Sequence, residues 1–181
     1  MIALEVRHAL ALDRMLFVVA NDPWQKADAE VTPASLRFEM VAEAVEHINE
    51  RMGAAVLEAS DVEIRRGGLT YTADTLEQLH AGNPDAELFL LVGSDAAAGL
   101  DSWKRTEAIR RFATTVVVDR GGREGGRPPE GWDHVVVEVP VMEVSSSDLR
   151  DRIAGGAPVE ALIPPTVIDG ISRLGLYRRT S

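Results

Sequence analysis

The chain has 181 residues and a formal net charge of −10 at pH 7, from 29 acidic and 19 basic side chains. A single hydrophobic core commonly serves about 100–200 residues, so we expect one domain over residues 1–181. With 45% hydrophobic and 27% charged residues, the composition excludes a wholly disordered chain. The absence of cysteine excludes disulfides, cysteine-ligated zinc and a thiol nucleophile.

Charge and hydropathy also restrict the partners. An isoelectric point near 4.9 argues against a general nucleic-acid binder, which needs a basic surface to neutralise phosphates. No apolar run approaches the roughly 20 residues that a membrane helix needs, and no signal-peptide pattern opens the chain. We therefore expect a cytoplasmic protein with neither a membrane nor a nucleic acid as its partner.

Short apolar runs alternate along the chain with segments of helical periodicity. The runs predict strands over residues 15–20, 55–59, 87–92, 114–118 and 135–139. Helices are predicted over residues 3–12, 32–50, 72–79 and 103–112, from residues 145–147 onward, and over residues 165–174. Near-continuous apolar strands are typical of a parallel sheet covered by helices on both faces. The alternation therefore predicts an α/β fold with a doubly wound parallel sheet.

The beginning of the chain departs from this pattern. Residues 3–12 are predicted to be helical, and no strand precedes them. Doubly wound folds usually begin with a strand and a turn whose backbone N–H groups can bind phosphate. We therefore expect that the first strand and its turn are missing from this sequence.

Residues 21–26 follow the first predicted strand and combine polar and aromatic side chains. Lys26 could meet a polyphosphate, and Trp24 could cover a ring. Trp24 could equally be a loop tryptophan packed at the edge of the core. The next helix is expected to begin with Thr32 as its cap, before Pro33 at the first helical position.

Residues 66–76 carry a glycine pair, three threonines and a tyrosine ahead of a predicted helix. This composition indicates a loop that binds polar ligand atoms. The alternative is an ordinary loop in which Thr72 caps the helix and Asp74 stabilises its first turn.

Gly93, Ser94 and Asp95 directly follow the third predicted strand. Ligands of open α/β sheets gather at the carboxyl ends of the strands. Glycine lets a ligand approach the backbone, and Asp95 could accept bonds from ribose hydroxyls or help to hold a metal. The alternative is a tight turn into a helix that Asp95 caps.

Two further features lie between the third and fifth predicted strands. Trp103 is either a stacking platform for a ring or a core aromatic residue. Residues 121–131 are rich in glycine and proline and lack apolar periodicity, which predicts a mobile surface loop within the domain.

Residues 144–150 follow the last predicted strand and include three consecutive serines and Arg150. Hydroxyls and unpaired N–H groups at the start of a helix favour an anion, and Arg150 could add a bidentate phosphate contact. The alternative is an ordinary serine cap with Asp148 in the first turn. The four histidines share no metal-like spacing, so no protein metal site is predicted.

Taken together and in this order, these sequence motifs resemble those of the nicotinate-mononucleotide adenylyltransferase family of NAD biosynthesis. The matching strings are residues 23–26, 37–40, 67–76, 92–95 with Trp103, 145–150 and 163–177. The resemblance covers essentially the whole chain. It implies a Rossmann-like nucleotidyltransferase fold and the transfer of AMP from ATP to nicotinate mononucleotide, which gives deamido-NAD and pyrophosphate. Mg²⁺ is expected to accompany ATP.

The resemblance also implies roles for individual residues. Lys26 and Arg150 would be catalytic, close to the reacting phosphates. ATP would be bound by Gly93, Asp95, Ser146, Ser147 and Arg150. Nicotinate mononucleotide would be bound by Thr72, Trp103 and Arg37, with Trp103 stacked on the pyridine ring and Arg37 at the phosphate.

One departure from the family leaves alternatives open. The family begins with a strand followed by a Gly-Gly-x-Phe-Asp-Pro-x-His-x-Gly-His signature, and this sequence contains no such string. His8 is no remnant of it, because the preceding residues resemble the helix that follows the signature. A truncated or inactive nucleotide-binding paralogue is therefore one alternative, and pantetheine-phosphate adenylyltransferase is another. The threonine–tyrosine loop at residues 70–72 and Trp103 favour the pyridine-nucleotide branch. A homo-oligomer remains open.

Overall fold

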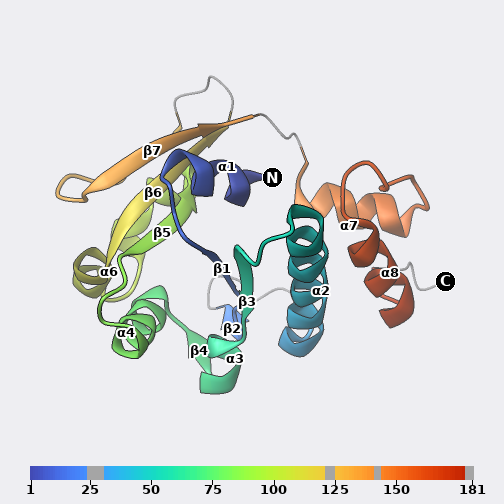
Figure 1. Cartoon of the computed structure of the whole chain (residues 1–181), viewed down its shortest axis with the longest axis horizontal. Coiled ribbons are helices and arrows are strands. Elements are labelled where there is room, and N and C mark those ends of the chain that lie inside the picture. The colour runs from blue at the N-terminus through green and yellow to red at the C-terminus, as the bar shows by residue number, and fades with distance from the viewer. Residues whose placement is uncertain (24–30, 121–124, 141–143, 178–181) are drawn as a thin grey trace. The chain divides into compact units, whose positions relative to one another are not determined.

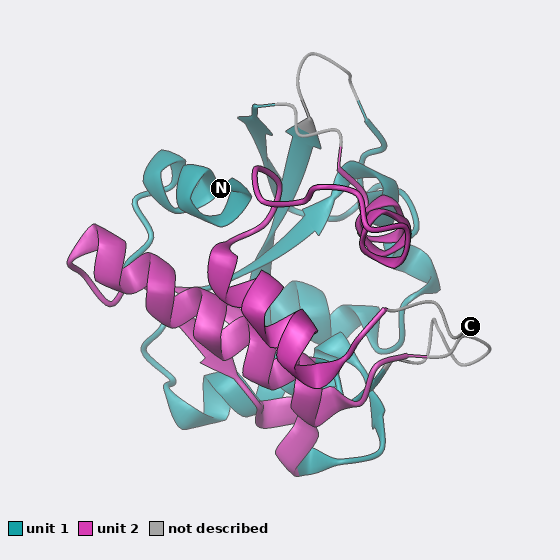
Figure 2. Ribbon diagram, turned by 90° about the vertical axis from the view of Figure 1, so that its right-hand side faces the viewer, with its two compact units in different colours: residues 1–13, 20–29, 66–141 teal, residues 14–19, 30–65, 142–181 magenta. Residues whose placement is uncertain are grey.

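A computed structural model of the chain describes residues 1–23, 31–120, 125–140 and 144–177. Its contacts divide the chain into two compact units, which are described one at a time (Figure 2). The first unit comprises Met1–Asp13, Ala20–Ala29 and Arg66–Val141. The second comprises Arg14–Val19, Glu30–Arg65 and Met142–Ser181. No helix in the described ranges is long and apolar enough to cross a membrane.

The first unit is built on a parallel sheet of three strands (Figure 1). Strand β6 (Ala113–Arg120) lies in the centre, between β5 (Leu88–Gly93) and β7 (His134–Val139). All three strands were predicted from their apolar runs, to within two residues at each end. β-Branched side chains fill the register, as where Val117 of β6 lies opposite Val92 of β5 and Val136 of β7.

Helices cover both faces of this sheet, because successive strand residues point to opposite sides. On one face, α1 (Ile2–Ala9) inserts the wholly buried Val6 among Val116, Val118, Val137 and Val139. On the other face lie α4 (Thr72–Gly82) and α6 (Thr106–Phe112). Their buried residues, with Leu100 and Trp132, form a second cluster, whose members are Ala73, Leu76, Leu100, Ile109 and Trp132. The predicted doubly wound arrangement is therefore confirmed.

The second unit contains a two-stranded parallel sheet of β1 (Met15–Val18) and β3 (Leu57–Ser60). Helix α2 (Ala34–Met52) contacts β3 and also α8 (Pro165–Leu174). Asn49 ties α2 to β3: its Nδ2 donates to the Leu57 carbonyl over 2.8 Å. The short α3 (Val62–Arg66) follows β3, and α7 (Ser146–Ala154) precedes α8 in the chain.

The expected threonine cap of α2 is wrong. Pro33 occupies the cap position, without a side-chain capping bond. The Thr32 hydroxyl instead lies 3.1 Å from the hydroxyl of Tyr177, while the Thr32 carbonyl accepts a bond from Arg37 Nε. Pro33 has ψ of 139°, outside the helical region, and its carbonyl accepts from the Arg37 amide over 3.0 Å, so α2 begins without a capping hydroxyl.

Among the described residues, β1 pairs only with β3, and β5 pairs only with β6. On β1, Leu16 and Phe17 are 38% and 37% exposed, although both are large and apolar. The expected absence of a first strand concerns residues outside this sequence and stays a prediction.

Four elements too short for a periodic pattern also belong to the first unit. Strand β2 (Asp22–Pro23) pairs in parallel with β4 (Leu69–Thr70). Helix α5 (Ser94–Ala97) follows β5 directly, and a single 3-10 turn spans Leu100–Ser102.

The segment before β7 is anchored at the carboxyl end of β6. Asp119 is buried there and accepts two bonds from Arg127, with Oδ1–Nη1 and Oδ2–Nη2 distances of 3.0 and 2.6 Å. Arg127 also donates to the carbonyl of Gly125 over 3.3 Å. Of the predicted surface loop at residues 121–131, residues 121–124 lie outside the described part of the chain.

Gly125 and Gly126 pack against α5 at distances that leave no room for a side chain. A Cβ at Gly125 would lie 2.1 Å from Ser94 Cβ, and one at Gly126 would lie 2.8 Å from the Ser94 carbonyl oxygen. Real Cβ atoms do not approach so closely. The two glycines therefore let this segment lie directly against the turn between β5 and α5.

We expect Gly126→Ala to lower the free energy of unfolding by about 1–3 kcal/mol, because the new methyl group overpacks this contact. Gly99→Ala is the matched control, since its nearest neighbour would lie at an ordinary 3.7 Å. The control should change the free energy by less than about 1 kcal/mol. Urea unfolding followed by circular dichroism measures both. Equal losses in the two variants would contradict the close packing of Gly126.

Candidate functional site

A glycine pair shapes the loop that leads into α4. Gly67 and Gly68 have φ angles of +72° and +69°, in the left-handed region that favours glycine. Asn21 Nδ2 donates to the Gly68 carbonyl over 3.0 Å, and Thr70 Oγ1 donates to the Asp22 carbonyl over 3.1 Å. Residues 21–23 and the glycine–threonine loop, predicted as separate motifs, are therefore bound to each other.

Residues 24–26 of the first predicted motif lie outside the described part of the chain. They include Lys26, a predicted catalytic residue, and Trp24. The bonds made by Asn21 and Thr70 hold residues 21 and 22, which precede Trp24 and Lys26 in the chain, against the loop of residues 68–70.

Thr72 is the first residue of α4 and is half-buried. Its predicted alternative role as the helix cap is wrong, because Tyr71 holds the cap position and no side chain caps the helix. Tyr71 has extended backbone, which turns the loop into the helix. Thr72 therefore lies in a first turn whose amides lack carbonyl partners within the helix, a place that suits polar ligand atoms.

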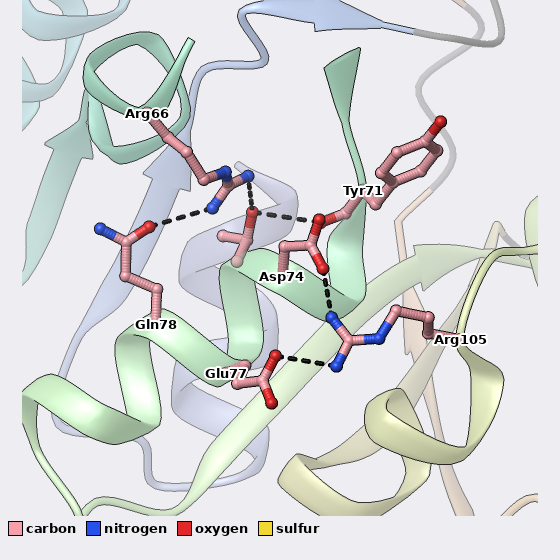
Figure 3. Close-up of polar contacts among 7 residues, drawn as sticks. Arg66, Tyr71, Asp74, Glu77, Gln78 and Arg105 are labelled. Atoms are coloured by element: carbon pink, nitrogen blue, oxygen red, sulfur yellow. Dashed lines mark hydrogen bonds and ion pairs between the residues drawn. The ribbon is translucent and has the colours of Figure 1, made fainter. Parts of the chain in front are cut away.

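Helix α4 is braced by arginines from two sides (Figure 3). Arg66 donates to Thr75 Oγ1 over 2.9 Å and to Gln78 Oε1 over 3.0 Å. Arg105 pairs with Asp74 and with Glu77, the latter over 2.9 Å. Hydrogen bonding to Glu77, and next to Asp74, raises the pKa of Arg105 above its ordinary value, so this guanidinium stays charged.

Trp103 lies just before α6 and is half-buried. It packs against the cluster of α4 and α6 described above, and also against a cluster of Val92 of β5, Ala97 of α5 and Val117 of β6. Part of the indole therefore belongs to the core, as one of the two predicted interpretations has it, and part of it is exposed. The stacking role stays a prediction.

The turn after β5 is open on the side of Gly93. A Cβ there would meet no atom within 4 Å among the described residues, other than those of its chain neighbours. Asp95 is exposed in the first turn of α5. Its predicted alternative role as a cap is wrong, because Gly93 holds the cap position and no side chain caps α5. A ligand can therefore approach the backbone of Gly93 beside a carboxylate.

In the second unit, the start of α7 has the features of an anion site. Ser145 is the cap: its Oγ accepts from the Asp148 amide over 3.0 Å and donates to Asp148 Oδ2 over 2.6 Å. The ordinary serine-cap interpretation is therefore right for Ser145. Ser146 and Ser147 lie exposed in the first turn, where amide groups and the helix dipole favour negative charge.

Arg150 adds a full positive charge to this helix start. Its Nη2 donates to Ser147 Oγ over 3.2 Å, and the side chain is exposed. No carboxylate in the described part of the chain forms an ion pair with it. The charge is therefore left for an anionic ligand.

Arg37, the remaining predicted residue, lies in the first turns of α2 and is half-buried. Its Nε donates to the carbonyl of Thr32 over 2.8 Å, a bond that ties the helix start to the preceding segment. This arginine therefore has a structural contact in addition to its predicted role at a phosphate.

The predicted residues fall into two groups, each described within its own unit. Thr72, Gly93, Asp95 and Trp103 belong to the first unit, and Arg37, Ser146, Ser147 and Arg150 belong to the second. No group of three or more histidine, aspartate or glutamate side chains in the described ranges could hold a metal ion.

The sequence reasoning missed the residues that hold these groups in place, Arg66, Arg105, Asp119 and Arg127. Each pairs with a residue at least eight positions away, so no local spacing marks it.

A cavity of about 400 Å³ lies away from these residues, where β5 and β6 begin. Arg110 and Arg111 line it, together with the acidic Glu87 and Asp133. The guanidinium of Arg111 lies over the ring of Phe112, 5.3 Å from its centre. Charges of both signs line the cavity, so it shows no preference for a phosphate ligand.

Comparison with known proteins supplies a family. A family model described as cytidylyltransferase-like matches residues 1–152. A probable nicotinate-nucleotide adenylyltransferase of Corynebacterium kroppenstedtii is 39% identical over 178 residues, covering 97% of this chain and 82% of that protein. A protein of the same description from Leifsonia xyli is 40% identical over 179 residues, covering 97% and 84%.

Solved structures agree in fold. A Plasmodium falciparum nicotinic acid mononucleotide adenylyltransferase complexed with APC aligns with a TM-score of 0.73 and 17% identity, covering 98% of this chain and 88% of that one. The same enzyme complexed with NaAD aligns with a TM-score of 0.68 and 19% identity, covering 95% and 90%. The predicted Rossmann-like nucleotidyltransferase fold is confirmed, and the sequence identity to the curated relatives shows that the chain belongs to the nicotinate-nucleotide adenylyltransferase family.

Proposed function

We propose that this chain transfers AMP from ATP to nicotinate mononucleotide, giving deamido-NAD and pyrophosphate. Family membership supports the kind of reaction, and the names of the relatives support the substrates. The observation that carries the proposal is the start of α7. There an unpaired arginine, two exposed hydroxyls and the helix N-terminus meet, as a polyphosphate requires.

The reaction needs no nucleophile from the enzyme. An oxygen of the mononucleotide phosphate attacks the α-phosphorus of ATP, a new P–O bond forms, and the bond to the bridging oxygen breaks. The electron pair of that bond leaves with pyrophosphate. Catalysis therefore depends on holding the two phosphates in line and on neutralising the charge that develops on the oxygens.

We assign the ATP phosphates to the start of α7. Ser146 and Ser147 would donate from first-turn amides and hydroxyls, and Arg150 would donate from its guanidinium. The resemblance also assigns Gly93 and Asp95 to ATP. The open backbone at Gly93 allows contact, and the Asp95 carboxylate can accept from ribose hydroxyls.

We assign the binding of the pyridine end of the mononucleotide to Thr72 and Trp103. The exposed part of the indole offers a flat apolar surface for the ring. Thr72, at the start of α4, offers a hydroxyl and first-turn amides for polar groups. Arg37 is assigned to the phosphate of the mononucleotide.

Two parts of the proposal rest on the resemblance alone. Lys26 would lie near the reacting phosphates as a catalytic cation. Mg²⁺ enters with ATP as part of the substrate, and when bound it neutralises charge on the phosphate oxygens. A homo-oligomer is compatible with this assignment.

We expect the purified chain, given ATP, Mg²⁺ and nicotinate mononucleotide, to form deamido-NAD and pyrophosphate in equal amounts. Chromatographic separation of the nucleotides, together with a coupled pyrophosphate assay, measures both products.

Phosphopantetheine in place of nicotinate mononucleotide is the matched control for this reaction. Product formed with phosphopantetheine alone would assign the chain to the coenzyme A branch. Binding of both nucleotides without any product would support a nucleotide-binding paralogue and overturn the proposed activity of this chain.

We expect Trp103→Ala to weaken the binding of nicotinate mononucleotide and Arg150→Ala to weaken the binding of ATP. Loss of ring stacking should raise the Kd for nicotinate mononucleotide about tenfold and leave that for ATP within about twofold. Loss of the Arg150 guanidinium should raise the Kd for ATP about tenfold and leave that for the mononucleotide within about twofold. Titration calorimetry with each substrate alone measures all four constants. An equal effect of Trp103→Ala on both would mean that Trp103 serves only the core.

A further inference from the structure

Arg105 has an unusual backbone for its residue type. Its φ and ψ are 56° and 46°, in the left-handed region that residues other than glycine rarely adopt. It lies two residues after Trp103, in the turn that leads into α6. Such a conformation persists where the surrounding structure holds it, so the contacts of this side chain need an explanation.

The side chain of Arg105 bridges two carboxylates on one helix. Nη1 donates to Asp74 and Nη2 donates to Glu77 Oε2 over 2.9 Å. Asp74 and Glu77 lie three residues apart on α4, and therefore on the same face of the helix. The planar guanidinium suits this arrangement, because its donors point outward in a fixed fork (Figure 3).

The backbone of Arg105 starts the next helix. Its carbonyl accepts from the amides of Ala108 and Ile109 over 2.9 and 3.3 Å. One residue thus joins the turn that carries Trp103, the face of α4 and the first turn of α6. The wholly buried Ile109 and the buried Leu76 then meet in the cluster against which Trp103 packs.

Arg105 connects the turn that contains Trp103 to the helix that begins with Thr72, and these are the two residues assigned to the pyridine end. Thr72 begins α4, and Asp74 lies in the same first turn. Trp103 lies in the same turn as Arg105, on the other side of the bridge. The spacing between the indole and Thr72 therefore depends on how firmly this turn is held to α4.

We propose that Arg105 is a positioning residue for the mononucleotide: its fork on Asp74 and Glu77 fixes the indole of Trp103 relative to Thr72. This inference rests on the proposed function, which assigns those two residues to the pyridine end. Arg105 would act through Trp103 and Thr72 and would not itself touch the substrate. The competing explanation is a surface ion pair of little consequence, since half of the Arg105 side chain is exposed.

Three variants separate the fork from the backbone conformation. Arg105→Ala removes the fork and keeps a residue that is strained at this φ. Arg105→Gly removes the fork and relieves the backbone. Arg105→Lys keeps one charge, which can pair with one carboxylate but cannot span both.

Arg173→Ala is the matched control. Arg173 bridges Glu39 and Glu43 of α2 over 2.6 Å each, and its 52% exposure is close to the 50% of Arg105. The Arg173→Ala variant removes an equivalent fork from α2, which does not carry Thr72. Helix α2 does carry Arg37, but that arginine is held separately, by its bond to the Thr32 carbonyl.

We expect Arg105→Ala and Arg105→Gly to raise the Kd for nicotinate mononucleotide about tenfold, with the Kd for ATP within about twofold. Arg105→Lys should recover part of the loss, to about threefold, because one pairing remains. Arg173→Ala should leave both constants within about twofold. Titration calorimetry measures the constants, and KM and kcat follow for the same variants. We expect the change in KM for the mononucleotide to exceed the change in kcat.

The outcomes separate this inference from the function on which it rests. If Trp103→Ala weakens the mononucleotide and Arg105→Ala does not, the positioning role is overturned and the site assignment stands. If neither variant weakens it, the assignment of the pyridine end is wrong. Retained affinity in Arg105→Gly with loss in Arg105→Ala would assign the effect to backbone strain and overturn the role of the fork. Equal losses in Arg105→Ala and Arg173→Ala would also overturn it, as a general effect on stability.

Discussion

The burial of both faces of the central strand β6 is the constraint on which the rest of the first unit depends. Because α1 covers one face and α4 with α6 covers the other, apolar side chains fill the strands, and polar groups are pushed toward the strand ends. Asp119 is one such group, and its burial demands a partner for its charge. Arg127 supplies the partner and in doing so brings Gly125 and Gly126 against the turn that follows β5. The packing of the sheet thus leads, step by step, to the shape of the surface beside Gly93.

Charge pairing distinguishes three arginines of this acidic chain from Arg150. Arg105, Arg127 and Arg173 each bind carboxylates through both terminal nitrogens or with two partners, and they serve to hold one element against another. Arg150 donates to a serine hydroxyl at the start of α7, and no carboxylate in the described ranges forms an ion pair with it. In a chain of net charge −10, an unpaired guanidinium above a helix N-terminus is a local reversal of sign. It can attract a polyphosphate without making the whole surface basic.

Sequence reasoning succeeded where the signal is local. The five predicted strands and the six predicted helices all exist, and the last helix matches its predicted residues. Strands covered on both faces need continuous apolar runs, and half-buried helices impose a period of 3.6 on the chain. Caps were predicted less well: neither Thr32, Thr72 nor Asp95 caps its helix, since a proline, a tyrosine and a glycine in extended conformation hold those positions. The two-residue strands β2 and β4 are too short for any period. The arginine forks could not be predicted either, because Arg105 finds Asp74 and Glu77 across 31 and 28 residues.

The phosphates and the pyridine ring of the proposed substrates need different kinds of binding surface. The elements assigned to each differ accordingly in how firmly they are held. A phosphate is bound mainly by charge, which acts over several ångströms and tolerates small displacements. The exposed start of α7 with Arg150 meets that need without a rigid frame. A ring stacked on an indole depends on contact distance and angle, and it loses most of its energy when the platform tilts. The turn of Trp103 is accordingly held by buried packing on one side and by a charged fork on the other, so the more directional interaction is assigned to the more firmly held element.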